Sequence, residues 1–373
     1  MKILQSSKYD RQERITWWDQ SALSRSKVLV VGAGALGNEI VKNLSLVGVG
    51  NITIVDMDSI EHTNLARCVF FRQGDEGKNK AQVLAGAAKD LNPDITTSFY
   101  SVPVQKLGNA FLNSFDLVIA GLDNREARIW LGASLRRLGK VWIDGAIEGL
   151  MGKVQTFTPD GPCYACSMTD DEWKILAHRR SCSLLGVEEM LGGHTPTNAT
   201  TSSIIAGIET QEAIKYLVGK RELGAIENKI FRIIGEQMAT FLSAVEPDEN
   251  CPYHEDLVEV TKNIKIPHNL AELWSDQNLD SLDYLSFYDD FVLIEPCTVC
   301  QNEPELGYAD LMSKIAKCQT CGTTRQDRSY NRIAKDDTVT KIVLKKEFFP
   351  YASLLKIESN NSYTFRLEGE INE

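Results

Sequence analysis

Apolar and polar positions alternate along the first part of the chain in a pattern that predicts strands separated by helices. Short β-branched runs mark the strands, and runs with apolar residues every three or four positions mark the helices. The predicted elements are strands at 28–31, 52–55, 96–100, 115–120 and 141–144 and helices at 36–47, 78–91 and 125–138. Such alternation is typical of an α/β fold with a doubly wound, mostly parallel sheet.

The flanking segments have other patterns. Residues 8–26 look helical and are rich in Arg, Gln and Trp, whereas 149–158 alternate as an antiparallel strand would. A helix is expected at 204–218, and the strand pieces at 230–246 are expected to complete the first domain.

The last part of the chain predicts a second, smaller domain. Residues 258–290 are mixed, with Asp-rich turns from Trp274 to Asp290, and strands are expected at 342–344, 354–357 and 363–367. We therefore predict three parts, which are a large α/β domain at 1–258, a connecting segment at 259–290 and a small β-rich domain at 291–373.

A glycine turn follows the first predicted strand. Gly32, Gly34 and Gly37 stand between that strand and a helix, where backbone N–H groups and the helix dipole favour an anion. Asp56 ends the second strand, 24 positions after Gly32, where a βαβ unit places a carboxylate on a ribose hydroxyl. This pattern alone also fits a dinucleotide-binding domain.

The residues beyond the second strand favour a nucleoside triphosphate with a metal ion. A dehydrogenase has no need of two cations and an extra acid in this place. Arg67 and Lys80 can neutralise phosphates, and Asp123, after the fourth strand, can hold Mg²⁺.

Taken together, these motifs resemble the ubiquitin-activating enzyme superfamily, which includes the bacterial adenylyltransferases for thiamine and molybdopterin sulfur carriers. The resemblance covers roughly residues 8–258 and indicates a single-chain form with an added zinc ribbon. The matching residues are Tyr9-Asp-Arg-Gln12, Gly32, Gly34, Gly37, Asp56, Asp58, Asn64, Arg67, Lys80 and Asp123.

The resemblance implies that ATP and Mg²⁺ are used to adenylate the C-terminal glycine of a ubiquitin-like or sulfur-carrier protein ending in Gly-Gly. Asp56 would bind the ribose, Arg67 and Lys80 the phosphates, and Asn64 would orient a phosphate or the attacking oxygen. Arg11 matches an arginine that, in dimeric members, reaches ATP in the neighbouring subunit, and this implies a homodimer.

A later step is also implied by position. The Thr/Ser-rich stretch 194–203 resembles the loop that crosses over the adenylate, and Cys182 lies just before it, where the family has its thioester-forming cysteine. Arg179 and Arg180 would lower the pKa of this thiol, and a conjugating enzyme would then take the acyl group. The alternative is a loop cysteine without a role. Cys68 is expected to be a packing residue.

The other cysteines predict two zinc ions. Cys163 and Cys166 with Cys251 and His254 fit one tetrahedral structural site, in which the histidine replaces the fourth cysteine that most family members have. The alternative is two unrelated pairs of buried thiols.

The second zinc site is predicted as a zinc ribbon with a partner-binding role for its domain. It consists of two Cys-x-x-Cys pairs separated by 17 residues, namely Cys297, Cys300, Cys318 and Cys321. A redox dithiol is the rival interpretation.

Composition narrows the partners and the compartment. The net charge of −11 argues against a broad nucleic-acid surface or binding to an anionic membrane, and leaves room only for a local basic patch. The chain has no apolar run long enough for a membrane span and no secretory signal at its beginning, so we expect a cytoplasmic protein. Two other functions stay open, a sulfur-carrier adenylyltransferase without a thioester step and a degenerate nucleotide-binding partner subunit.

Overall fold

The computed structural model divides into two compact units. The first comprises Met1–Val104 and Asn113–Leu257, and the second comprises Gln105–Leu112 and Val258–Glu373. The structure describes residues 7–169, 173, 196–224, 226–254, 262–265, 267–276, 283–308, 318, 320–323, 325–344, 352–357 and 363–368.

An eight-stranded sheet forms the centre of the first unit, in the order β3-β2-β1-β4-β5-β6-β7-β8. The parallel strands are β1 (Lys27–Val31), β2 (Asn51–Val55), β3 (Thr96–Tyr100), β4 (Leu117–Ala120) and β5 (Trp142–Glu148). The antiparallel strands are β6 (Met151–Phe157), β7 (Lys229–Ile234) and β8 (Ala239–Ala244). The predicted doubly wound, mostly parallel fold is confirmed. Because the strand order reverses between β1 and β4, ligands are expected at the carboxyl ends of these strands.

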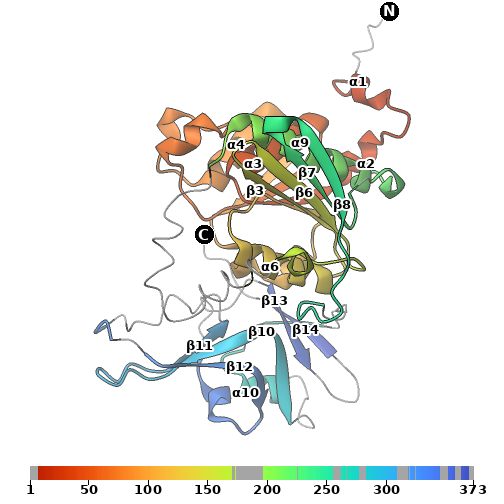
Figure 1. The fold of residues 1–373 in the computed structure, drawn as a ribbon. Helices are drawn as coiled ribbons and strands as arrows, with labels where there is room; N and C mark the ends of the chain where they lie inside the picture. Colours follow the sequence, from red (N-terminus) through yellow and green to blue (C-terminus); the bar gives the residue numbers. More distant parts are fainter. Residues whose placement is uncertain are drawn as a thin grey trace, which may run out of the picture. The chain divides into compact units, whose positions relative to one another are not determined.

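Helices cover both faces of this sheet (Figure 1), with α3, α4 and α9 on one face and α6 on the other. The α-helices of this unit are α1 (Asp10–Glu13), α2 (Gln20–Arg25), α3 (Ala35–Val47), α4 (Lys80–Leu91), α6 (Arg125–Arg137) and α9 (Ala199–Leu217). The 3₁₀ turns along the chain are η1 (His62–Ala66), η2 (Gln73–Asp75), η3 (Val104–Leu107), η4 (Ala165–Ser167), η5 (Arg221–Leu223), η6 (Gly235–Gln237) and η7 (Thr338–Lys341).

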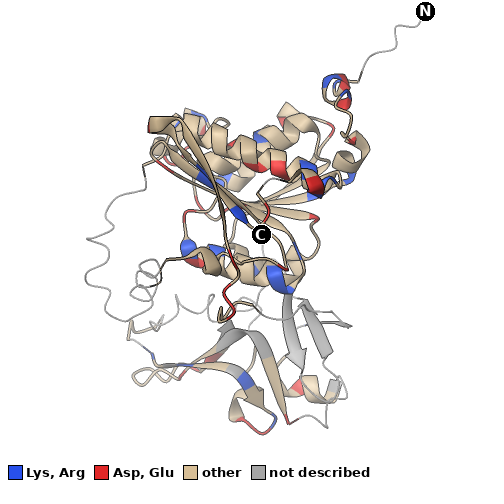
Figure 2. Ribbon diagram, turned by 45° about the vertical axis from the view of Figure 1, so that its right-hand side comes forward, with Lys and Arg blue, Asp and Glu red and all other residues tan. Residues whose placement is uncertain are grey.

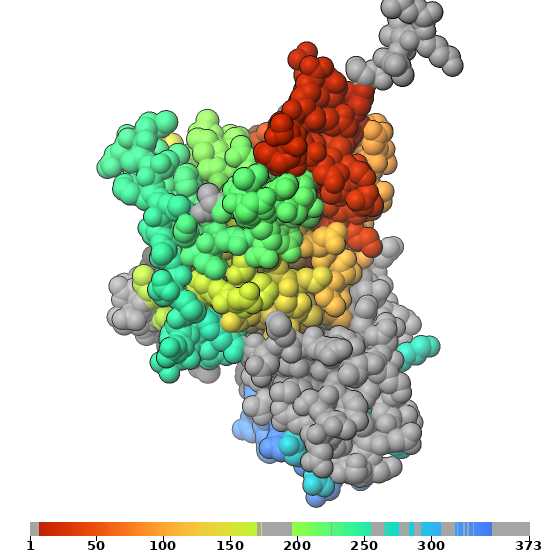
Figure 3. All heavy atoms as spheres, turned by 90° about the vertical axis from the view of Figure 1, so that its right-hand side faces the viewer, coloured from red at the N-terminus to blue at the C-terminus, as the bar shows by residue number. Residues whose placement is uncertain are grey.

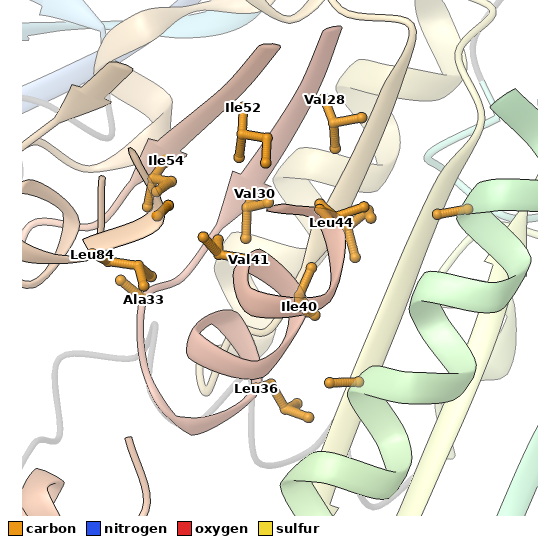
Figure 4. Close-up of a cluster of buried hydrophobic side chains, with 14 of the residues drawn as sticks. Val28, Val30, Ala33, Leu36, Ile40, Val41, Leu44, Ile52, Ile54 and Leu84 are labelled. Carbon is orange, nitrogen blue, oxygen red and sulfur yellow. The ribbon is translucent and has the colours of Figure 1, made fainter. Parts of the chain in front are cut away.

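Part of the core of the first unit lies between α3 and the strands β1 and β2 (Figure 4). Val28 and Val30 of β1 point toward Ile40 and Leu44 of α3, and all four are fully buried. Each such side chain contributes roughly 1.5–3 kcal/mol by leaving water. The alternate β1 residues are buried on the opposite face, so both faces of the strand are covered, as in other parallel sheets.

In two segments the helices start at other residues than the sequence predicts. Residues 8–26 form two short helices because Asp19 caps a new one, its side chain accepting a hydrogen bond from Ala22 N. The stretch 199–203, expected in a loop, forms the first turn of α9. Asn198 caps this turn by accepting from Thr201 N, and the Ser202 hydroxyl donates to Asn198 O.

The second unit is built on a six-stranded sheet. Its path is β11-β10-β13-β14-β9, and β12 pairs with β10. The strands are β9 (Lys262–Lys265), β10 (Tyr284–Ile294), β11 (Glu305–Tyr308), β12 (Asp327–Ala334), β13 (Ala352–Ile357) and β14 (Tyr363–Glu368), and the helices are α5 (Asn109–Leu112) and α10 (Ala271–Asp276). The predicted zinc-ribbon region therefore lies in a unit whose sheet contains both antiparallel and parallel strand pairs.

Two predictions of local structure in this unit are wrong. Residues 342–344 form no strand; Val343 makes a single bridge to Asn269 after a 3₁₀ turn. Residues 284–290, expected in Asp-rich turns, begin the long strand β10. The expected connecting segment 259–290 contains β9, α10 and the start of β10, all of which belong to the second unit.

A short segment from the middle of the chain also belongs to the second unit. Residues 105–112 lie between β3 and β4 in sequence, and α5 packs along β13, whose residues come much later in the chain. The chain therefore enters the second unit twice.

Charges are dispersed over the first unit. Lys and Arg are interspersed with Asp and Glu on its helices and loops (Figure 2). Among the described residues, every helix is too short or too polar to cross a lipid bilayer.

Candidate functional site

The glycine turn after β1 is built by close contacts between backbones. Gly32 has φ +99°, and a Cβ there would lie 2.6 Å from Gly121 O. A Cβ on Gly37 would lie 1.9 Å from Gly32 O, so only glycine lets α3 begin this close to the turn. Gly34 is the N-cap of α3, and a Cβ there would meet nothing within 4 Å. The N-terminus of α3 is thus open for a ligand to approach.

Asp56 ties this turn to the loop after β2. Its Oδ2 accepts from Ala33 N at 2.7 Å, and its Oδ1 accepts from Asp58 N at 2.8 Å. Burial raises the pKa of this carboxyl, and the two backbone N–H groups oppose that shift. The carboxylate therefore lies at the carboxyl edge of the sheet, beside the glycine turn.

Lys80 provides a cation beside the two acids. It is the first residue of α4, and its Nζ lies 3.0 Å from Asp58 Oδ2. The Asn79 side chain donates to the carbonyls of Asp56 and Asp58 and caps α4 by accepting from Gln82 N. The Lys80 side chain is only 13% exposed, whereas that of Asp58 is 51% exposed. A phosphate arriving from solvent can reach this cation by displacing the exposed acid.

Arg67 and Asn64 lie at the end of η1. Asn64 is buried and accepts from Glu61 N at 2.9 Å, and the Arg67 guanidinium donates to Thr63 O at 2.6 Å. Burial raises the pKa of the Cys68 thiol to about 11, although the charges of Arg67 and Lys80 oppose this shift. Cys68 is 3% exposed, as expected of a packing residue.

Asn38 fixes this region and was missed by sequence reasoning. Its Nδ2 donates to Ala33 O at 2.9 Å, and its Oδ1 accepts from Phe70 N at 3.1 Å, so one buried amide joins the glycine turn to the segment after Arg67. A polar residue on the apolar face of a predicted helix was the available signal.

The loop after β4 completes the edge. Asn124 caps α6 by accepting from Glu126 N and Ala127 N, and Asp123 beside it is exposed. An exposed carboxylate that the helix cap leaves accessible is a suitable ligand for a partly hydrated Mg²⁺.

Arg128 is hydrogen-bonded to this loop and was not identified from the sequence. Its Nε donates to Asp144 Oδ1 at 2.8 Å, and its Nη2 donates to Leu122 O and, at 3.0 Å, to Gly145 O. Arg128 and Asp144 are both buried. Burial would lower the pKa of Arg128, but Asp144, Tyr164 and Asp123 together more than offset this effect, so the pKa is raised.

Glu209 of α9 is a second buried acid near this pair. It is 0% exposed, and within the described part of the chain neither carboxylate oxygen has a hydrogen-bond partner. Burial raises its pKa well above the usual range, and the charge of Asp144 raises it further. Burial therefore favours the uncharged form of Glu209. Its carboxyl lies against Gly145, where a Cβ would lie 2.5 Å from Glu209 Cδ.

Arg11 lies on α1, in the N-terminal segment that projects from this unit (Figure 3). Its side chain is exposed and, among the described residues, has no hydrogen bond or ion pair. Cys182, Arg179, Arg180 and the first part of the stretch 194–203 lie outside the described residues.

Three cysteines and one histidine converge in the first unit. We call this the mixed cluster; it consists of Cys163, Cys166, Cys251 and His254. Sγ of Cys163 lies 3.7 Å from that of Cys166 and 3.5 Å from that of Cys251. These distances are close to the roughly 3.8 Å between sulfurs on a tetrahedral zinc ion with 2.3 Å bonds. The donor set and its spacing therefore fit zinc.

Four cysteines converge in the second unit. This ribbon cluster consists of Cys297, Cys300, Cys318 and Cys321. Sγ of Cys297 lies 3.5 Å from that of Cys321, and Sγ of Cys300 lies 3.4 Å from that of Cys318. Backbone N–H groups at Cys300 and Cys321 lower the pKa of Cys297 and Cys318, which favours the thiolates that zinc binds.

Comparison with known proteins agrees with the fold and identifies the family. The family model that describes the ThiF family matches residues 9–253. The chain belongs to the ThiF family. The family resemblance that the motifs indicated is thereby confirmed.

Relatives of this ThiF-family protein are named either as activating enzymes E1 or as adenylyltransferases. The SAMP-activating enzyme E1 of Haloferax volcanii is 35% identical over 234 residues, which is 62% of this chain and 82% of that protein. The NEDD8-activating enzyme E1 catalytic subunit of Dictyostelium discoideum is 37% identical over 156 residues, 38% of this chain and 35% of that protein. A probable molybdopterin-synthase adenylyltransferase of Porphyra purpurea is 31% identical over 224 residues, 59% of this chain and 53% of that protein. The chain spans only about a third of the NEDD8-activating relatives.

Solved structures share the fold. The crystal structure of E. coli MccB with ATP has a TM-score of 0.57 and 21% identity, and the match covers 68% of this chain and 75% of MccB. At this level of identity the likeness shows the fold alone.

Proposed function

We propose that this ThiF-family protein uses ATP to adenylate the C-terminal glycine of a ubiquitin-like protein. The observation that carries the proposal is the gathering of Gly34, Asp56, Lys80 and Asp123 at the carboxyl edge of one sheet, around the open N-terminus of α3. An anion-binding turn, a cation and two acids are what a nucleoside triphosphate and its metal ion require.

The reaction joins the carrier to AMP. A carboxylate oxygen of the C-terminal glycine attacks the α-phosphorus of ATP, the bond to the bridging oxygen breaks, and pyrophosphate leaves with both electrons of that bond. Arg67 and Lys80 would neutralise the phosphates, Asp56 would hold the ribose, and Asn64 would orient a phosphate or the attacking oxygen. Mg²⁺, held by Asp123, would supply further charge neutralisation. The protein contributes positioning and electrostatic stabilisation.

The Lys80–Asp58 ion pair suits this role. The Asp58 carboxylate orients the largely covered Lys80 side chain before ATP arrives, and its own exposure lets a phosphate take its place without moving α4. Lys80 thus starts near its working position, which lowers the cost of organising the site.

The finer steps are also proposals. Cys182 would displace AMP and form a thioester, from which a conjugating enzyme takes the carrier, and Arg11 would act across a homodimer. The two clusters would each hold one structural zinc ion, with all four ligand positions filled by protein. Cysteines used in this way fit a reducing compartment, so we place the protein in the cytoplasm.

Carrier-dependent exchange between ATP and labelled pyrophosphate tests the adenylation step. Lys80→Ala should lower the exchange rate by about 100-fold or more, the scale of one lost preorganised contact. Lys78→Ala is the matched control, because Lys78 is two positions away and pairs with Asp75 at 2.9 Å. An equal effect of the two substitutions, or none for Lys80→Ala, would contradict the proposed site.

A second candidate is a sulfur-carrier adenylyltransferase that stops at the adenylate; the Porphyra relative's name favours it. The fate of the carrier separates the two. Cys182→Ala should leave pyrophosphate exchange intact and abolish a reductant-sensitive adduct between protein and carrier, whereas Cys68→Ala should change neither. Persulfide on the carrier, or an adduct that survives in Cys182→Ala, would favour the second candidate. Absence of pyrophosphate exchange would favour a degenerate partner subunit.

A further inference from the structure

Arg128 contacts two places that the proposed adenylation reaction does not connect. On one side its Nη2 donates to Leu122 O, in the loop that carries Asp123. On the other side its guanidinium carbon lies 5.9 Å from the centre of the Tyr164 ring. Tyr164 stands between the ligands Cys163 and Cys166 of the mixed cluster and is 4% exposed.

The contacts of Arg128 with Leu122 and with Tyr164 depend on each other, because the guanidinium is held in one position. Arg128 is 6% exposed, and Asp144 and Gly145 of β5 fix its guanidinium through two further hydrogen bonds. A desolvated cation within about 6 Å of the face of an aromatic ring is attracted to that ring. A metal ion bound by Cys163 and Cys166 fixes the backbone on both sides of this ring. Loss of the metal would therefore change the surroundings of the Arg128 guanidinium, which holds the loop 121–124.

We propose that Arg128 is a positioning residue that couples metal occupancy of the mixed cluster to nucleotide binding at the loop 121–124. The proposal rests on the proposed function, because it takes ATP as the ligand of that loop. With the metal bound, the Tyr164 ring stays against Arg128 and the guanidinium stays on Leu122 O. Without it, the segment between the two cysteines loosens and the loop loses this support.

Coupling of two binding sites is reciprocal. If metal at the mixed cluster strengthens ATP binding, then ATP must strengthen metal binding by the same factor. Typical couplings are 5–150-fold. Where ATP tightens metal binding by slowing dissociation, the rate of metal release reports on the coupling without any measurement of catalysis.

The test measures the rate of zinc release from the full-length protein to a chelating dye, with and without saturating ATP and Mg²⁺. In the wild type, ATP should slow release from the mixed cluster by about 5-fold or more. Release from the ribbon cluster, assigned with a Cys300→Ser variant, should not respond and serves as the internal control.

Two substitutions of the same residue isolate the ring. Tyr164→Phe keeps the ring and should keep the effect of ATP on zinc release. Tyr164→Leu removes the ring but leaves the bonds from Arg128 to Leu122 and Asp144, and it should abolish the effect while two zinc ions remain bound. Arg128→Lys keeps the positive charge but not the several N–H donors of the guanidinium. Like Tyr164→Leu, it should abolish the effect of ATP on zinc release.

The outcomes are distinguishable. An equal slowing by ATP in the wild type and in Tyr164→Leu overturns the coupling, as does an unchanged release rate in a wild type that binds ATP and exchanges pyrophosphate. Failure of the wild type to bind ATP in equilibrium dialysis overturns the proposed function and the coupling together.

Discussion

The two four-ligand clusters differ in how much of the chain each one organises. In the mixed cluster, Cys163 and Cys251 are 88 positions apart, and the chain between them contains α9, β7 and β8. In the ribbon cluster, the contacting cysteines are 24 and 18 positions apart, and Cys300 and Cys321 are exposed. A link across a long loop restricts the unfolded chain more than a link across a short one. The mixed cluster is therefore expected to stabilise a whole sheet, and the ribbon cluster a local turn.

The largest expected effect is the loss of the mixed cluster. Cys251→Ser should remove one of two zinc ions and lower the free energy of unfolding of the first unit by on the order of 4 kcal/mol, the loop-closure value for a link of this length. Thermal unfolding followed with zinc analysis measures this loss. A fully folded, equally stable variant with a single zinc ion would contradict the comparison.

A second difference concerns buried acids. Glu305 of the second unit accepts from Arg325 at 3.1 Å, whereas Glu209 of the first unit has no such partner among the described residues. The pKa of Glu209 is raised on folding, so the folded state binds a proton that the unfolded state has released near neutral pH. Stability must then fall as pH rises, by up to about 1.4 kcal/mol per pH unit, until the raised pKa is reached.

Glu209→Gln removes this titration. Between about pH 6 and pH 8, urea unfolding of the wild type should lose stability relative to the variant, and the gap should narrow on going toward about pH 4, the usual pKa of the unfolded carboxyl. Only the difference in slope is diagnostic, because a buried amide has costs of its own at every pH. Parallel pH dependences would show that the charge of Arg128 keeps Glu209 ionised in the folded protein.

The smallest expected effect is on activity when the ribbon cluster is broken. Cys300→Ser should release the other zinc ion and keep pyrophosphate exchange within about threefold of wild type, a change below about 1 kcal/mol. Cys251→Ser in the same assay should lose far more. Similar losses in both variants would mean that the ribbon cluster also supports the nucleotide site.

Local patterns explain what the sequence predicts well. The strands around Val30 and Ile54 are β-branched and buried on both faces, and α3 starts directly after the glycine turn. The spacing of apolar residues and glycines was therefore enough to predict the fold class and the glycine turn. The ribbon cluster was readable for the same reason, since each pair of cysteines shares one turn.

Long-range partners explain what was missed. In the sequence Arg128 resembles any helix residue, and its role depends on the hydrogen bond to Asp144 of β5. The role of Asn38 likewise depends on a distant residue, because its side chain accepts a hydrogen bond from Phe70 N. Asn198 could have been identified as a helix cap, but the Thr and Ser residues after it resemble a loop, and their bonds to carbonyls four residues earlier are invisible in composition.

The segment 105–112 has a consequence for how the protein is made. α5 leaves the ribosome about 240 residues before β13, the strand along which it packs. At about 5–20 residues per second, synthesis leaves roughly 10 to 50 seconds between them. During this interval the first unit can complete its sheet while Phe111 and Leu112 still lack the strand that α5 will contact. The second unit therefore cannot complete its contacts around α5 until the last part of the chain has been synthesised.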